Sequence, residues 1–202
     1  SLWMYMGFKH LNGPLEWDSI SKAQYVAYVH ETYHVPLPDI ASTIGDHHDT
    51  VRRLYRGLVV LRQAEKEGVF NRNDAWGKRF AYSHLWTGLG YASIQRFLGI
   101  EPDVKEKISP VPRANIAKLG ELCRWFYGDK ASGKKPIIKS QNPDLRKLSE
   151  ILSTSRGYTA LSRMKEGDDI SAVWRFSRSD EVMLRESLVD AEKSLKEALR
   201  SR

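Results

Sequence analysis

Apolar residues recur at three- and four-residue intervals along most of the chain, a spacing that places them on one face of an α-helix. Between residues 19 and 33 the residues of this face are Ile20, Ala23, Val26, Ala27, Val29 and Tyr33. Adjacent segments do not carry the sustained alternation of apolar and polar residues that a β-sheet requires. The pattern therefore predicts an all-α protein.

Turn and cap residues divide this pattern into individual helices. An aromatic-rich lead-in over residues 1–17 precedes a first helix over about 19–33, which stops at Pro36. Two short helices joined by a tight turn are expected next, then a long helix that runs to about Glu67 and is closed by Gly68. The later helices are expected over residues 80–98 with breaks at Gly88 and Gly90, and over 113–127, 142–153, 158–165 and from 179 onward.

The segment from Glu101 to Pro112 contains three prolines and separates two helical stretches. Prolines clustered in this way mark turns and linkers. The chain of 202 residues is also longer than an average domain of roughly 100–150 residues. We therefore expect two helical domains, residues 1–100 and residues 101–202.

Residues 37–56 have the spacing of a helix-turn-helix. This motif needs a small residue where its helices cross, a residue that tolerates left-handed backbone in the turn, and apolar residues that lock the second helix. With Leu37 as the first position, Ala41 and Gly45 meet the first two needs. The apolar positions are met by Ile40, Ile44, Val51 and Leu54. The second helix is then expected to start near His47 or His48 and to enter the major groove of DNA.

The exposed face of this second helix carries the residues that we expect to contact DNA. Those opposite Val51 and Leu54 are His48, Asp49, Arg52, Arg53 and Arg56. Arginine can donate two hydrogen bonds to guanine O6 and N7, so Arg52 is the leading candidate to read a base. Phosphates, which fix register without reading sequence, are expected at Thr50, Lys22 and Arg62. The alternative for these arginines is a solvated helix surface.

The charge of the chain also favours DNA as the partner: the sequence has 32 Lys and Arg against 25 Asp and Glu, so its net charge is +7. Such a field attracts polyanions, and double-stranded DNA is the expected partner. One cysteine, Cys123, excludes an internal disulfide and suits a reducing cytoplasm; we expect a buried helical thiol. Apolar runs stay well short of the roughly 18–20 residues of a membrane span. A soluble, cytoplasmic protein is expected.

Four short runs resemble the central region of ParB-like proteins. They are Gly13-Pro14-Leu15-Glu16-Trp17, Lys22-Ala23-Gln24-Tyr25, residues 40–45 (IASTIG) and residues 51–55 (VRRLY). The stretch covers about a fifth of the chain, and residues 136–145 are similar to the C-terminal part of less-studied ParB-like relatives. In that family a helix-turn-helix grips DNA and follows a nucleotide-binding or nuclease-like domain.

That preceding domain has no counterpart before Gly13, and the family's Glu-Asn-x-x-Arg motif is absent from Lys9 to Pro14. The resemblance therefore implies the DNA-binding part of a ParB-like protein, as in plasmid or chromosome partition, without CTP or nuclease chemistry. Because the chain enters directly into Leu2-Trp3-Met4-Tyr5-Met6, we expect a piece of a longer protein whose N-terminal domain is a further partner.

Residues 128–134 match a phosphate-binding P-loop except that Lys135 follows in place of the Ser or Thr that holds magnesium. A P-loop follows a strand and opens a helix, whereas this segment follows a predicted helix and precedes Pro136. We interpret it as a flexible basic loop and expect Lys134 and Lys135 to contact the DNA backbone.

Metal and catalytic sites are not expected. His30 and His34 are four residues apart and His47 adjoins His48, but zinc normally takes three or four protein ligands and the sole cysteine is distant. The sequence also lacks a Gly-x-Ser-x-Gly nucleophile motif. We therefore expect no enzyme activity, no metal and no cofactor.

The C-terminal helix leaves two arrangements open. Its apolar residues fall in near-heptad register at Leu184, Leu188, Ala191, Leu195 and Ala198. The helix either pairs two chains into a homodimer or packs on its own domain. Two rival functions also stay open: a protein-interaction or assembly module that does not bind DNA, and the targeting part of an enzyme.

Overall fold

A computed structural model describes residues 17–76, 80–101, 109–164, 169–178 and 180–200. Within these ranges the chain is all-α, as the sequence predicts, and the only strand-like feature is an isolated bridge between Asp129 and Lys134. The helices are α2 (Ser19–Tyr33), α3 (Leu37–Ile44), α4 (Thr50–Lys66), α5 (Tyr82–Gly88), α6 (Ala92–Leu98), α7 (Ile116–Tyr127), α8 (Asp144–Leu152), α9 (Ser155–Ser162), α10 (Ile170–Ser177) and α11 (Asp180–Arg200). Short 3₁₀ turns cover Arg72–Asp74 and Arg113–Asn115.

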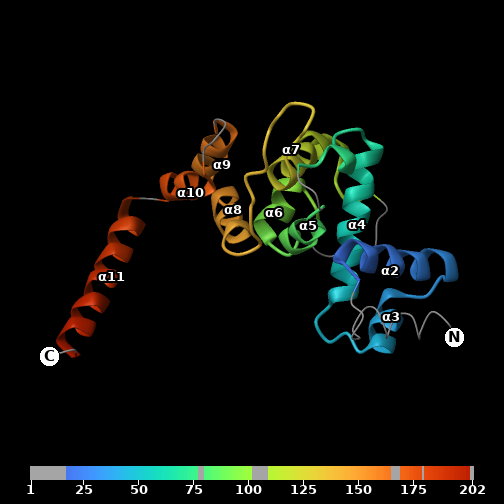
Figure 1. Cartoon of the computed structure of the whole chain (residues 1–202), viewed down its shortest axis with the longest axis horizontal. Helices are drawn as coiled ribbons and strands as arrows, with labels where there is room; N and C mark the ends of the chain where they lie inside the picture. The colour runs from blue at the N-terminus through green and yellow to red at the C-terminus, as the bar shows by residue number, and fades with distance from the viewer. Residues whose placement is uncertain (1–16, 77–79, 102–108, 165–168, 179, 201–202) are drawn as a thin grey trace.

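The long helix α4 is the centre of the packing. It contacts α2, α3, α5 and α7, and Figure 1 shows α2 and α3 at one end of it and α7 at the other. Its buried residues are Val51, Leu54, Tyr55, Gly57, Leu58, Val59, Val60, Leu61, Gln63 and Ala64. Apolar residues lie on more than one face of α4, so more than one face has to be buried.

The later helices continue the same packing. Helix α8 lies against α6, α9 and α10, and its residues Leu145, Leu148 and Ile151 are buried. Buried hydrophobic residues from Ala23 to Val173 belong to one cluster. Helix α11 has no extended interface with another described element and projects away from α10 (Figure 1).

Most helix predictions agree with the structure, and several differ. Only α3 precedes the long helix, so the expectation of two short helices was wrong: the long helix is itself the second helix of the pair. Helix α10 was not predicted; it begins after Asp169, whose carboxylate accepts a hydrogen bond from Ser171 N. Helix α9 starts at Ser155, before the expected residue 158, because the Thr154 hydroxyl accepts a hydrogen bond from Gly157 N.

Several expectations lie outside the described residues. They include the lead-in before Trp17, with most of the first run that resembles ParB-like proteins, and Leu184 as a side chain. The boundary at residues 101–112 is described only at residue 101 and from 109 onward.

Gly57 lets α5 approach the backbone of α4. A Cβ at this position would lie 2.6 Å from the Tyr82 hydroxyl and 2.8 Å from Trp86 Cβ. The buried Tyr82 hydroxyl uses this space to donate a hydrogen bond to the Leu54 carbonyl oxygen. Burial raises the pKa of this hydroxyl, which therefore stays protonated and remains a donor.

Gln63 ties α4 to the segment that leads into α7. Its side chain is only 4% exposed; it donates to Val111 O at 2.7 Å and accepts from Val111 N at 3.0 Å. Both backbone groups of Val111 are thereby satisfied in a site that excludes water. One amide side chain thus joins segments on both sides of residue 101.

Gly57→Ala is expected to lower the free energy of unfolding by about 1–3 kcal/mol, because the new methyl group overpacks the α4–α5 contact. Lys66→Ala, at an exposed position of the same helix, is the control and should stay within about 0.5 kcal/mol of the parent. Urea unfolding followed by circular dichroism measures both. Equal stabilities for the two variants would show that α5 does not press on Gly57.

Gln63→Leu is expected to cost about 2–4 kcal/mol, since it leaves a buried N–H and a buried carbonyl without partners. Gln24→Leu makes the same chemical change on the exposed surface of α2 and should be nearly neutral. The same urea titration compares them. A Gln63→Leu variant as stable as Gln24→Leu would contradict the bonding to Val111.

Candidate nucleic-acid interface

Helices α3 and α4 pack through the residues that the sequence predicts. Leu37, Ile40, Ile44, Val51 and Leu54 are each at most 5% exposed. Ala41 is partly buried and packs against the same core. These two helices and α2 form a three-helix unit around residues 19–66, in which α3 supports the N-terminal part of α4.

Gly45 ends α3 in the left-handed conformation expected for the turn. Its φ is 70°, and its N–H donates to the carbonyls of Ala41 and Ser42. A residue with a side chain would be strained at this φ. The sequence prediction for Gly45 is therefore confirmed.

Asp46 sets where α4 begins, and sequence reasoning missed it. Its carboxylate accepts hydrogen bonds from His48 N at 3.0 Å and from Val51 N at 2.7 Å. An anion at this point also interacts favourably with the positive end of the helix dipole. Because these bonds hold residues 46–49 in a turn, α4 begins at Thr50, and the predicted start at His47 or His48 was wrong.

Because α4 begins later than predicted, two of the predicted contact residues lie outside the helix. His48 and Asp49 lie in the turn and are exposed, and Asp49 has a positive φ of 57°. Thr50 is the first residue of α4 and is partly buried. These three side chains surround the N-terminus of α4 and do not extend along its outer face.

Arg52 is exposed and paired with Asp49. Its Nε lies 3.0 Å from Asp49 Oδ1, its Nη2 donates to Oδ2 at 3.0 Å, and the two side chains are 63% and 49% exposed. An ion pair this open to water contributes at most about 1 kcal/mol. A ligand that offers stronger acceptors can therefore displace Asp49.

Arg53 lies against an aromatic ring from another helix. Its guanidinium carbon is 4.7 Å from the centroid of the Trp86 ring on α5. Guanidinium stacking on tryptophan fixes the direction of the side chain while its N–H groups stay available at the edge. The sequence carried no signal for this pairing, because it depends on how α5 crosses α4.

Arg56 completes the group one turn further along α4 and is partly buried. Burial, and then the positive charge of Arg52, lower its pKa from the ordinary arginine value. The guanidinium stays charged at neutral pH. Three guanidinium groups thus lie within the first two turns of α4, together with the carboxylates of Asp46 and Asp49.

Two further candidates lie on α4 and α2. Arg62, on the exposed side of α4, donates to Glu31 Oε1 of α2 at 2.6 Å. Lys22 is on the first turn of α2 and is partly buried. His30, considered above as a metal ligand, has its Nδ1 2.8 Å from Val35 O and its ring edge-on to Tyr55, so it supports the α2–α3 connection.

The segment 128–135, which the sequence predicts as a flexible basic loop, forms a hydrogen-bonded turn. Asp129 and Lys134 exchange backbone hydrogen bonds of 2.7 and 2.9 Å. The Asp129 carboxylate accepts hydrogen bonds from the Ser132 hydroxyl and from Ala131 N, and these bonds keep its pKa below the ordinary aspartate value. The chain's own carboxylate thus occupies the N–H groups that a P-loop offers to phosphate, which argues against a P-loop here.

Lys134 and Lys135 are both exposed on this turn, and Lys135 Nζ lies 5.8 Å from the Trp76 ring centroid. The turn is anchored by Lys130 N, which donates to Asp74 O, in the segment that follows α4. These lysines therefore lie near the C-terminal end of α4. Since 17 residues of helix span about 25 Å, they form a second basic site, separate from Arg52.

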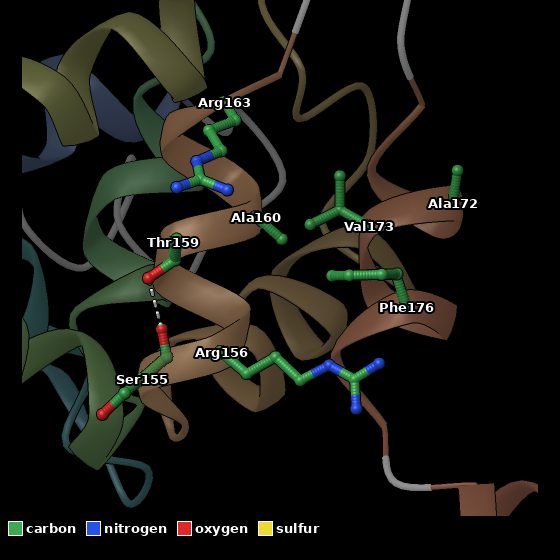
Figure 2. Close-up of a pocket in the computed structure, with 8 residues that line it drawn as sticks. All are labelled: Ser155, Arg156, Thr159, Ala160, Arg163, Ala172, Val173 and Phe176. Atoms are coloured by element: carbon green, nitrogen blue, oxygen red, sulfur yellow. Dashed lines mark hydrogen bonds between the residues drawn. The ribbon is translucent and has the colours of Figure 1, made fainter.

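The C-terminal part contains a groove between α9 and α10, with a volume of about 630 Å³ (Figure 2). A second hollow of about 660 Å³ lies beside the 128–135 turn and includes Glu65, Asp74, Arg124 and Asp129. Sequence reasoning identified neither of them, because each is formed by helices or turns that meet only in the folded chain.

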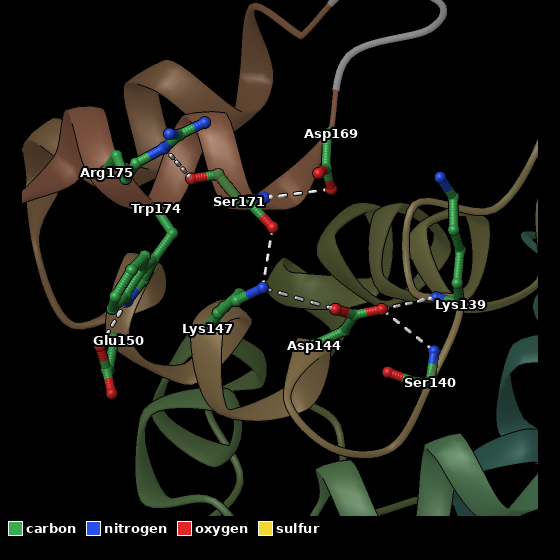
Figure 3. Close-up of polar contacts among 9 residues, drawn as sticks. All are labelled: Lys139, Ser140, Asp144, Lys147, Glu150, Asp169, Ser171, Trp174 and Arg175. Carbon is green, nitrogen blue, oxygen red and sulfur yellow. Dashed lines mark hydrogen bonds and ion pairs between the residues drawn. The ribbon is translucent and has the colours of Figure 1, made fainter.

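A polar network holds α10 on α8 (Figure 3). Lys147 Nζ donates to Ser171 Oγ at 2.8 Å and lies 4.0 Å from Asp144 Oδ1. Asp144 Oδ2 accepts from the backbone N–H groups of residues 139 and 140, and Trp174 Nε1 donates to Glu150. Lys147 is thus held between a carboxylate and a hydroxyl, an arrangement that fixes the position of α10 and so the shape of the groove.

Cys123 is completely buried, as expected, and burial raises the pKa of its thiol to about 12. Such a thiol is not a nucleophile at neutral pH. Among the described residues, groups of three or more side chains able to hold a metal ion are not found. Nor does the described part contain a helix both long and apolar enough to cross a bilayer.

Comparison of the chain with protein-family models, with curated proteins and with solved structures finds no match.

Proposed function

We propose that the chain binds double-stranded DNA through α3, the 45–49 turn and the first two turns of α4. The observation that carries the proposal is the set of three guanidinium groups, Arg52, Arg53 and Arg56, at the start of a helix whose opposite face is locked into the core. Helix-turn-helix proteins place such a helix N-terminus in the major groove. The ParB-like resemblance agrees with this function and would make the chain the DNA-binding part of a longer protein.

The three arginines take different roles in this proposal. Arg52 is the most exposed and reads a base, exchanging the carboxylate of Asp49 for guanine O6 and N7. Arg53, aligned by Trp86, and Arg56, in its partly desolvated place, bind phosphates and fix the register. Thr50, Lys22 and Arg62 supply further phosphate contacts at the border, and Lys134 and Lys135 add an independent one.

Arg52→Ala should weaken binding to the preferred duplex by about 1–3 kcal/mol, because two base contacts are lost. The duplex is obtained by selecting bound fragments from a random library, and fluorescence anisotropy then measures Kd on it and on a scrambled duplex. Arg113→Ala, an exposed arginine outside the three-helix unit, is the matched control. Equal losses on both duplexes would refute the reading role of Arg52.

Lys134→Ala should weaken binding to all duplexes alike and reduce the slope of log Kd against log salt by about 1, because one phosphate contact is lost. The measurement repeats the anisotropy titration at several salt concentrations. If the unmodified chain binds its partner with an affinity that ignores salt, the proposal fails and the rival protein-interaction module is favoured.

A further inference from the structure

Exposed hydrophobic side chains concentrate in the last two helices. Of the eight large hydrophobic residues that the described part of the chain exposes, five lie between residues 176 and 199: Phe176, Leu188, Val189, Leu195 and Leu199. Apart from Val189, these residues lie on two surfaces, one on α11 and one at the α9–α10 groove, and exposed apolar groups of this kind mark interaction surfaces.

Helix α11 presents one of the two surfaces. Leu188, Leu195 and Leu199 are 62%, 66% and 66% exposed and recur at intervals of seven and four residues, so they share one face with Ala191. Val189 lies off this stripe. Glu192 flanks the stripe and is ion-paired with Lys196 at 2.6 Å.

The groove between α9 and α10 presents the other surface. Figure 2 shows Ala160 of α9 facing Val173 of α10, with Phe176 beside them and Arg156 and Arg163 toward the two ends. Arg156 stacks on Phe176 at 4.7 Å, and the residues that line the groove include two guanidinium groups and no carboxylate. The groove is therefore apolar at its centre and positive at its ends, which fits an amphipathic helix with an acidic flank.

In this structure the groove is not filled by the α11 of its own chain. Helix α11 starts at Asp180, directly after α10, and runs away from it (Figure 1). Leu195 lies 15 residues into the helix and hence about 22 Å from its start. The leucine stripe is thus positioned to reach a different molecule.

We propose that the α9–α10 groove receives the leucine stripe of α11 from a second copy of the chain, and that the reciprocal exchange forms a homodimer. Two identical contacts related by a twofold axis close on themselves, so the exchange produces a dimer and not a filament. Glu192 gains Arg156 or Arg163 as a partner in place of the Lys196 of its own helix. The proposal is independent of DNA binding.

Light scattering after size exclusion tests the assembly. The full chain should have twice the 23.2 kDa mass of one copy. Leu195→Glu on the stripe and Phe176→Glu in the groove should each weaken the dimer at least about tenfold, since either places a charge in an apolar contact. Val189→Glu, an equally exposed residue off the stripe, is the control and should leave the dimer intact. A monomer at every concentration, or a dimer that tolerates Phe176→Glu, would overturn the proposal.

Cross-linking identifies which surfaces meet and does not depend on how the glutamate variants fold. A chain with Ala172→Cys, on the groove, is mixed with a chain carrying Ala191→Cys, on the stripe, and treated with a short bis-maleimide. Cys123 is buried with a raised pKa and stays unreacted. The exchange predicts a covalent pair only in the mixture. Cross-linking of the Ala191→Cys chain with itself would instead indicate that two α11 helices pair with each other. A cross-link within one chain that carries both cysteines would indicate that α11 occupies the groove of its own chain. Either result contradicts the exchange.

Discussion

The close approach of α5 to α4 at Gly57 is the contact on which the rest of the structure depends. Without a side chain at residue 57, Tyr82 and Trp86 reach the backbone of α4, and the Tyr82 hydroxyl bonds to the Leu54 carbonyl. Together with the packing of α2 and α3 on α4, this contact fixes the rotation of α4 about its own axis. The rotation in turn decides which side chains of α4 are buried and which face outward, so the direction of the arginines follows from core packing.

The same contact links the core to the candidate interface. Trp86 packs at Gly57 with its Cβ and carries Arg53 on its ring. A rigid indole thus holds one guanidinium, while Arg52 is held only by the exposed carboxylate of Asp49. A fixed arginine beside one that can change partners suits a surface on which Arg53 binds phosphate and Arg52 contacts bases. Only Arg52 has to leave its partner, Asp49, to do so.

Sequence periodicity predicted what depends on local spacing and missed what depends on tertiary contacts. The limits of α2, the left-handed turn at Gly45 and the buried set from Leu37 to Leu54 follow from spacing and backbone geometry. The start of α4 was missed because the Asp46 carboxylate bonds to the N–H of a residue five positions away. The position of Arg53 was missed because Trp86 comes from another helix. The ordered 128–135 turn was missed because its stability comes from Asp129 bonding within the turn, which composition alone does not reveal.

The length of α4 constrains how both basic sites could serve one duplex. They lie near opposite ends of a helix about 25 Å long, whereas the major groove is about 12 Å wide. If α4 pointed straight into the groove, its C-terminal end and the neighbouring Lys134 would be held away from the DNA. Simultaneous contact therefore requires α4 to lie along the duplex surface, with Arg52 at one end and the 128–135 turn reaching a phosphate beyond the groove edge. In that orientation Glu31 must release Arg62 if that side chain is to bind a phosphate.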